Sequence, residues 1–180
     1  MKFCSECGRP VAFRIPPGDQ LPRHVCDACG TIHYSNPKLV AGCVPEWEGR
    51  ILLCRRAIEP RRGFWTIPAG FMENGETLMA AAAREAMEEA LARVEIGSLL
   101  AMVHVTHAQQ VHVMFRARLL EGAFGIGHES LESMLVEEKD VPWAEIAFAS
   151  TDFALRRYFE DRAAGREQLH ITEIDRARRP

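Results

Sequence analysis

The sequence predicts an α/β domain with a mixed sheet, preceded by a small module held together by a metal ion. Three observations lead to this prediction. Strand-like apolar runs and two helical segments alternate between residues 37 and 180, and a glycine-containing turn leads directly into the first helix. Four cysteines in two pairs fall within the first 30 residues. Mixed strands with a helix on either side are typical of an α/β sandwich.

Length and composition fit one sizeable domain with a small appendage. The chain has 180 residues, 47% of them hydrophobic, so a proper core can form. Its net charge of −3 argues against a general affinity for nucleic acid or for anionic membrane. No apolar stretch approaches the roughly 18 residues of a membrane span, and no signal-peptide pattern opens the chain. We therefore expect a cytoplasmic protein with reduced thiols.

The paired cysteines predict a structural zinc site. Two residues separate the members of each pair and eighteen separate the pairs, which are Cys4, Cys7, Cys26 and Cys29. Four thiolates close a tetrahedral shell around Zn²⁺ and leave no position open for catalysis. So short a segment cannot build a stable core alone, so the metal is expected to supply folding free energy. The alternative is a ribbon that has lost its metal.

We therefore predict a zinc ribbon over residues 1–36 and a catalytic domain over 37–180, since Pro37 and its neighbours break the chain. The basic residues of the ribbon are scattered rather than clustered. We accordingly expect the ribbon to pack against the catalytic domain or a second subunit rather than to bind nucleic acid.

Local patterns predict the elements of the larger domain in order. In the first half we expect a strand at 39–47, a turn at 48–49 and the antiparallel partner strand at 50–56. A charged loop at 57–63 and a short strand at 64–67 follow. A helix rich in alanine and glutamate follows at 77–91. In the second half we expect a hairpin of strands 93–106 and 109–120, followed by a glycine-rich loop at 122–127 and a strand at 130–136. Two helices at 143–148 and 151–162 and a final strand at 168–174 complete the domain.

Three carboxylates lie on one face of the helix predicted at 77–91. Glu85, Glu88 and Glu89 are spaced i, i+3 and i+4, which brings their Cβ atoms within roughly 5–6 Å. Like charges placed in this way repel, and folding does not require them. Mg²⁺ takes oxygen ligands and is usually shared between carboxylates and substrate phosphates. The cluster therefore predicts metal-assisted chemistry on a phosphate compound.

Gly70, Glu76 and residues 84–89 together resemble the Nudix box, the signature of hydrolases that cleave nucleoside diphosphates linked to another group. The match includes every charged position of that signature. The family usually has glycine where this chain has Leu91, which concerns the end of the helix and not the ligands. The resemblance implies a Nudix α/β/α sandwich and a Nudix pyrophosphohydrolase.

The resemblance also implies a set of ligands for catalytic Mg²⁺ or Mn²⁺: Glu76, Glu85, Glu88, Glu89 and the carbonyl near Ala69. Such ions activate water and stabilise the leaving phosphate. Arg84 is expected to orient the carboxylates through hydrogen bonds. Glu76 is either a further ligand or the partner of Arg84.

The general base and the substrate contacts are less constrained by the sequence. By resemblance, the base comes from a loop after the hairpin, where Glu129 and Glu132 are the candidates; ordinary exposed glutamates are the alternative. Arg55 and Arg56 are candidates for binding diphosphate or ribose, although strand alternation lets only one of them face a cleft. Phe71 is a candidate for stacking on adenine or flavin.

Other chemically capable side chains are expected to be structural. The three histidines of the hairpin, His104, His107 and His112, are expected to pack across the strands rather than contact substrate. Cys43 and Cys54 lie in apolar strands, where free cysteine behaves as a small hydrophobic residue.

Further stretches resemble plant chloroplast-type FAD and ADP-ribose pyrophosphatases, namely 36–38, 42–43, 52–54, 65–71, 129–132 and 147–148. The resemblance implies a homodimer that cleaves FAD to FMN and AMP, or ADP-ribose to AMP and ribose 5-phosphate. The plant transit peptide is absent, so we expect a bacterial cytoplasmic relative.

Two alternatives are kept. NADH pyrophosphatases also join a zinc ribbon to a Nudix domain, but they usually carry a Ser-Gln-Pro-Trp-Pro-Phe-Pro stretch that this chain lacks. A nucleotide-sensing regulator with a DNA- or protein-binding ribbon is the other alternative. Such regulators commonly lose carboxylates of the box, and this chain keeps them all.

Overall fold

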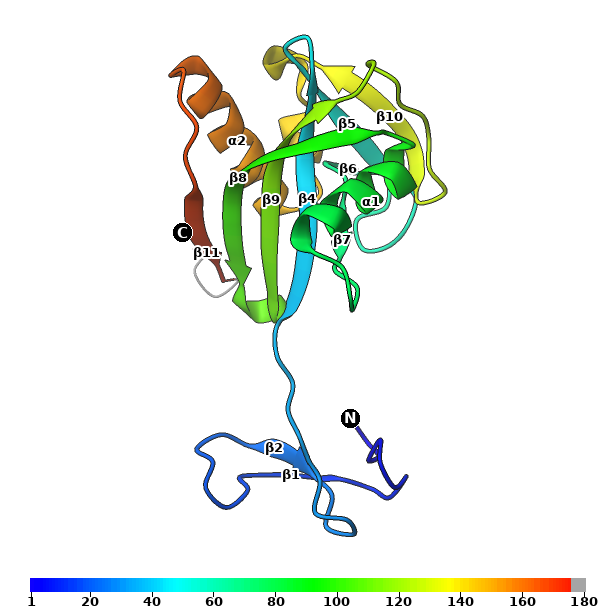
Figure 1. Ribbon diagram of the computed structural model, residues 1–180, viewed down its shortest axis with the longest axis vertical. Coiled ribbons are helices and arrows are strands. Elements are labelled where there is room, and N and C mark those ends of the chain that lie inside the picture. The colour runs from blue at the N-terminus through cyan, green and yellow to red at the C-terminus, as the bar shows by residue number, and fades with distance from the viewer. Residues whose placement is uncertain (176–180) are drawn as a thin grey trace. The chain divides into compact units, whose positions relative to one another are not determined.

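The computed structural model describes residues 1–175, which divide into two compact units at the step from Pro37 to Lys38 (Figure 1). The first unit contains a three-stranded antiparallel sheet, β1 (Ala12–Arg14), β2 (Arg23–Val25) and β3 (Ile32–His33). Tight turns follow the cysteine pairs, because Gly8 and Gly30 adopt φ values of 72° and 75° that glycine accepts without strain.

The second unit is a mixed sheet with one long helix against each face. Its elements are β4 (Lys38–Trp47), β5 (Arg50–Arg56), β6 (Trp65–Thr66), β7 (Ala69–Phe71), α1 (Leu78–Ala90), β8 (Val94–Val105), β9 (Gln110–Leu119), β10 (Ser130–Val136), α2 (Ala149–Ala163) and β11 (His170–Ile174). The strand order is β10-β5-β4-β9-β8-β11, with β6 beside β5 and β7 beside β4. The β4–β9 and β8–β11 pairs are parallel and the other pairs are antiparallel, so the predicted α/β sandwich with a mixed sheet is confirmed.

Alternation along β4 explains how the two faces are covered. Ala41 and Cys43 pack with small alanines of α1, whereas Val44 joins the core that contains Leu155 and Phe159 of α2. Alanine on the inner face of α1 lets this helix approach the sheet closely. Figure 1 shows α1 and α2 on opposite sides of the central strands.

The boundaries of α1 follow from its caps. Thr77 accepts a hydrogen bond from the backbone N–H of Ala80 at 3.1 Å, which satisfies one of the first free donors. At the other end Leu91 adopts φ 48° and ψ 31°, and its N–H donates to the carbonyl of Met87 at 3.0 Å. The left-handed turn is therefore kept without the usual glycine, at a cost of about 1 kcal/mol.

Several predicted elements differ in extent from the observed ones. The turn after residue 67 contains a further strand, β7, which pairs with β4. The helix predicted at 143–148 is a single 3₁₀ turn at Trp143–Glu145, because Ile146 is extended and forms a bridge to Trp65. Helix α2 begins at Ala149 rather than at residue 151.

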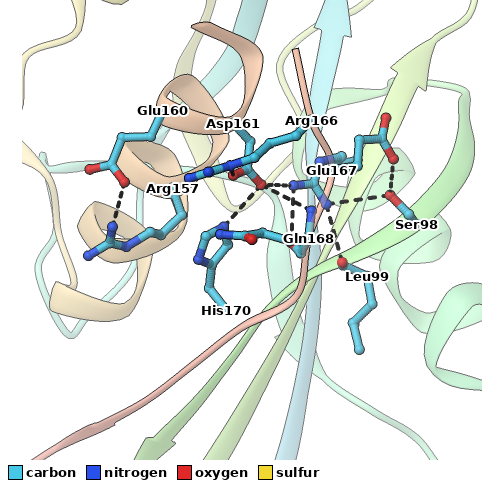
Figure 2. Close-up of polar contacts among 10 residues, drawn as sticks. Ser98, Leu99, Arg157, Glu160, Asp161, Arg166, Glu167, Gln168 and His170 are labelled. Atoms are coloured by element: carbon cyan, nitrogen blue, oxygen red, sulfur yellow. Dashed lines mark hydrogen bonds and ion pairs between the residues drawn. The ribbon is translucent and has the colours of Figure 1, made fainter. Parts of the chain in front are cut away.

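A buried charge network fixes the C-terminal strand at the edge of the sheet (Figure 2). Asp161 of α2 is buried, forms an ion pair with Arg116 of β9, and accepts hydrogen bonds from His170 Nε2 at 3.0 Å and the Gln168 N–H at 3.3 Å. Arg116 also donates to the carbonyl of Leu99 in β8 at 3.2 Å. The network therefore ties α2, β8 and β9 to the segment that leads into β11.

Among residues 1–175, no helix has the length and the apolar character that crossing a bilayer requires.

Candidate active site

A cavity of about 1000 Å³ opens in the second unit. Its lining comes from α1, β7, the loop between β5 and β6, the turn between β8 and β9, the start of α2 and the end of β11. This volume is at the upper end of the range of small-molecule sites, so it has room for an extended nucleotide. Residues of the box that lie in its lining are Ala69, Gly70, Phe71, Glu73, Arg84, Glu85, Glu88 and Glu89.

Glu85 and Glu89 are buried carboxylates that face this cavity, with residue exposures of 8% and 5%. Burial raises the pKa of Glu89 to about 8, although the N–H of Ala69 donates a hydrogen bond to its Oε2 at 3.2 Å. Burial also raises the pKa of Glu85, against the opposing effect of Arg84. The two carboxylates therefore have less positive charge around them than they need to ionise as readily as they would in water.

Gly70 makes room for one of these carboxylates. A Cβ atom at this position would lie 2.4 Å from Oε1 of Glu85, closer than any real contact. A side chain at position 70 would therefore displace the Glu85 carboxylate.

Arg84 organises the outer side of the cluster and uses all five of its N–H donors. They bond Oε2 and Oε1 of Glu76 at 3.1 and 2.9 Å, Oε1 of Glu85 at 2.8 Å, Oε2 of Glu88 at 3.0 Å and the carbonyl of Phe71 at 3.0 Å. A guanidinium saturated in this way holds its partners in fixed positions. Glu76 lies outside the cavity lining, so its contacts are those of a partner of Arg84.

The donor set around the cavity fits a divalent cation. Carboxylate oxygens are its preferred ligands, and a cation would supply the charge that Glu85 and Glu89 lack. Glu88 is half exposed and held by Arg84. The glutamates do not form a closed ligand set by themselves, since among the described residues only the four ribbon cysteines have all their ligand atoms within 4.8 Å.

Of the two candidate bases, the structure brings Glu129 to the cavity and Glu132 away from it. Glu129 lines the cavity, and its charge contributes to the raised pKa values of both Glu85 and Glu89. Glu132 lies 3.6 Å from Arg55 in an exposed ion pair between β10 and β5.

The loop that leads to Glu129 is attached to the end of α1. The N–H of Gly125 donates to the carbonyl of Ala90 at 2.6 Å, and the N–H of Gly127 donates to the carbonyl of Glu89 at 3.1 Å. These bonds satisfy carbonyls that the helix end leaves free.

Arg55 and Arg56 point in different directions, as alternation along β5 requires. Arg56 lines the cavity, donates to the carbonyl of Pro60 at 2.9 Å and lies 5.0 Å from the ring centre of Phe148. Arg55 lies outside the lining and donates to the carbonyl of Gly63 at 2.9 Å. Phe71 lines the cavity with 48% of its surface exposed.

Other residues of the cavity are not identified by the sequence. Gln110, Phe148, Ser150 and Glu173 line it but come from three separate segments. His112, predicted to pack, both packs and lines the cavity. No spacing pattern joins these residues, because β9, α2 and β11 meet only in the folded chain.

The ribbon cysteines are arranged as zinc requires. The Sγ atoms of Cys4 and Cys29 are 3.7 Å apart, and those of Cys7 and Cys26 are 3.5 Å apart. Zn–S bonds of about 2.3 Å place the sulfurs of a tetrahedral site roughly 3.8 Å apart. Nε2 of His33 lies 3.3 Å from Cys4 Sγ and supports the cluster from outside.

Comparison with known proteins assigns both units. Residues 36–159 match the family described as NUDIX domain, and residues 2–35 match the family described as Nudix N-terminal, a zinc ribbon. The chain belongs to the NUDIX hydrolase family. A NUDIX hydrolase from Nitrosomonas europaea is 55% identical, with a TM-score of 0.94 over 97% of this chain and 99% of that one.

Curated relatives of this NUDIX hydrolase are named NAD-capped RNA hydrolase NudC. The Chromobacterium violaceum protein is 38% identical over 95 residues, 52% of this chain and 34% of that protein. The Salmonella paratyphi C protein is 31% identical over 145 residues, 78% of this chain and 53% of that protein. The chain thus spans about half of these relatives or less. An ADP-ribose pyrophosphatase from Streptococcus suis, 22% identical with a TM-score of 0.63 over 76% of this chain and 99% of that one, shares the fold.

Proposed function

We propose that this NUDIX hydrolase cleaves the pyrophosphate bond of a nicotinamide dinucleotide such as NADH, yielding AMP and the reduced nicotinamide mononucleotide. The observation that carries the chemistry is the pair of buried carboxylates, Glu85 and Glu89, in a cavity of about 1000 Å³. The choice of dinucleotide follows the curated relatives, whose name refers to NAD.

In this proposal the side chains divide the work of one hydrolytic step. Glu85, Glu88 and Glu89 would hold the divalent cation, which when bound activates water and stabilises the leaving phosphate. Arg84 orients two of these carboxylates, and Arg56, which lines the same cavity, binds the diphosphate. Glu129 accepts the proton of the attacking water while the bond from phosphorus to the bridging oxygen breaks.

FAD and ADP-ribose form the second candidate substrate class. The stretches that resemble plant FAD and ADP-ribose pyrophosphatases favour it, as does the absence of the Ser-Gln-Pro-Trp-Pro-Phe-Pro stretch. The same metal cluster serves either class, so the distinction depends on the part of the cavity that receives the base.

RNA capped with the dinucleotide is a further candidate substrate, since the relatives are named for capped RNA. The ribbon presents few unpaired cations, because Arg14 and Arg23 are bonded to Asp27 and Asp19. A free dinucleotide is therefore the first substrate to test. A homodimer stays a prediction, for which sedimentation velocity is the direct measurement.

The test is chromatographic separation of products formed with Mg²⁺ from NADH, FAD, ADP-ribose and an NAD-capped RNA oligonucleotide. The proposal expects AMP and the highest kcat/KM from NADH among the free compounds. A higher kcat/KM for FAD or ADP-ribose than for NADH would favour the second candidate substrate class instead. Absence of AMP from the three free compounds and of nicotinamide mononucleotide from the capped RNA would exclude pyrophosphate hydrolysis of these substrates.

A further inference from the structure

A chain of three hydrogen-bonded side chains lies in the cavity away from the metal cluster. Nδ1 of His112 is 2.9 Å from Oγ of Ser150, and Nε2 of His112 is 2.8 Å from Oε1 of Gln110. All three residues line the cavity, and they connect the start of α2 to β9. The mechanism proposed above makes no use of them.

The orientation of the Gln110 amide in the structure assigns a direction to each hydrogen bond of His112. Oε1 of Gln110 is an acceptor, so Nε2 of His112 carries the proton and donates it. Nδ1 is then an acceptor, and the hydroxyl of Ser150 donates to it. Burial lowers the pKa of His112 to about 4, so the imidazole is neutral at pH 7 and has one donor and one acceptor.

This arrangement leaves the amide nitrogen of Gln110 available for a ligand. Within residues 1–175 no buried side-chain nitrogen or oxygen lacks a partner, and Oε1 carries the hydrogen bond recorded for this amide. The nitrogen therefore lies open to the cavity with two N–H donors.

Strand register gives the separation between His112, which holds this amide, and the strand beside the catalytic centre. Phe71 of β7 lies opposite Val40 of β4, and Val40 lies opposite His112 of β9. Two strand spacings of about 4.8 Å put His112 roughly 10 Å from the strand that contains Gly70 and supports Glu85. That separation suits the length of one nucleoside attached to a diphosphate at the carboxylates.

We propose that Gln110 is a specificity residue that donates a hydrogen bond to a carbonyl oxygen on the base-side group of the substrate, and that His112 and Ser150 are its positioning residues. For the substrate proposed above, this oxygen belongs to the carboxamide of nicotinamide. ADP-ribose has no such group, so the interaction discriminates between the two. The inference rests on the proposed function for the identity of the substrate.

The test compares steady-state kinetics with NADH and with ADP-ribose in the full-length protein. Gln110→Glu keeps an oxygen for His112 but replaces the donor by a second acceptor. It is expected to raise KM for NADH about tenfold or more, with kcat and the ADP-ribose kinetics within twofold of the parent. Gln109→Glu, which adds the same charge outside the cavity lining, is the matched control. Equal changes for both substrates, or no change for NADH, would overturn the inference.

Two further measurements test the direction of the hydrogen bond and the positioning role. The reduced 3-acetylpyridine analogue of the dinucleotide keeps the oxygen and loses the amide nitrogen, so the parent enzyme is expected to use it with a KM close to that for NADH. A KM for the analogue ten times that for NADH would mean that Gln110 does not donate a hydrogen bond to the carbonyl oxygen. His112→Phe is expected to raise KM for NADH while kcat and the ADP-ribose kinetics stay unchanged; a general loss of activity would contradict positioning.

Failure of the proposed function has a separate signature. If the parent enzyme cleaves FAD and not NADH, the nicotinamide assignment is wrong, and Gln110→Glu is then expected to raise KM for FAD, whose flavin also carries carbonyl oxygens. If the parent cleaves ADP-ribose alone, Gln110 has no such group to recognise and the inference is wrong.

Discussion

The carboxylate of Glu85 occupies the space that a side chain at position 70 would need, because a Cβ atom on Gly70 would lie 2.4 Å from its Oε1. The Glu85 side chain of α1 therefore packs over the backbone of β7 at Gly70. This contact couples the sequence of β7 to the position of a metal ligand.

Gly70→Ala is expected to displace the Glu85 carboxylate and lower kcat by about 10²-fold, since misplacement by about 1 Å has effects of this size. The melting temperature is expected to change little, because the displaced group lies at the open cavity. Kinetics with Mg²⁺ and differential scanning calorimetry check both expectations. Gly75→Ala is a harsher backbone change outside the lining, with φ 92° and nothing within 4 Å of the added atom. A larger loss of kcat in Gly75→Ala than in Gly70→Ala would contradict this account.

Glu89→Gln is expected to lower kcat by several orders of magnitude while the fold is kept, because an amide fills the same volume and cannot replace the charge that binds the cation. The change also removes a buried carboxylate whose pKa is raised to about 8, so the metal-free variant is expected to be at least as stable as the parent at pH 8 and above. Product assays and urea unfolding in EDTA measure the two effects. Glu95→Gln, in an exposed pair with Arg118, is the control. Parent-like turnover in Glu89→Gln would refute the metal cluster.

His112 is expected to make stability depend on pH in the acid range. Its pKa is lowered from 6.5 to about 4 by burial, so the unfolded chain binds the proton more readily than the folded one. The stabilisation is thus present above pH 6.5 and is lost as the pH falls towards 4, with a slope of at most about 1.4 kcal/mol per pH unit. Urea unfolding of the parent and of His112→Phe between pH 4 and 7 measures the difference. Identical slopes in the parent and in His112→Phe would contradict the assignment.

Removal of zinc is expected to unfold the ribbon and leave the second unit folded, because the ribbon has only small strands around its cysteines. Native mass spectrometry is expected to find one zinc per chain, and Cys29→Ser is expected to lose it. Amide hydrogen exchange then reports rapid exchange over residues 1–37 and parental protection in α1. Cys54→Ser, which alters a buried thiol of the second unit, is the control for zinc content. A ribbon that is protected without metal would refute the zinc assignment.

The sequence was most informative where function depends on neighbours along one helix or on paired cysteines. Glu85, Glu88 and Glu89 share a face because of the helical period, and the zinc ligands follow a fixed spacing. Alternation also limited the two arginines of β5 to one that faces the cavity, but only the fold identifies it as Arg56.

Other parts of the site depend on packing between distant segments. Glu129 and Glu132 differ by three residues, and a shift of register in β10 between Ser130 and Glu132 precedes the pairing of Glu132 with Arg55. Gln110 and Ser150 are 40 residues apart and meet through the imidazole of His112. No local pattern encodes these arrangements, because the first depends on the pairing of β10 with β5 and the second on the docking of α2 against β9.

The hydrogen bonds from Gly125 and Gly127 to the end of α1 have a consequence for how this enzyme can change. They hold the loop so close to the helix that a Cβ atom on Gly127 would overlap the carbonyl oxygen of Glu88, and one on Gly122 would clash with the ring of Trp47. These two positions therefore need glycine, whereas the exposed side chains of Ala123, Phe124 and Ile126 can vary without altering the position of Glu129 relative to Glu89. Adding or deleting a residue in the same loop would displace Glu129 from Glu89 by about the length of one residue. Homologues that keep this chemistry are therefore expected to preserve the length of the loop and its glycines at 122 and 127, and to vary at its exposed positions.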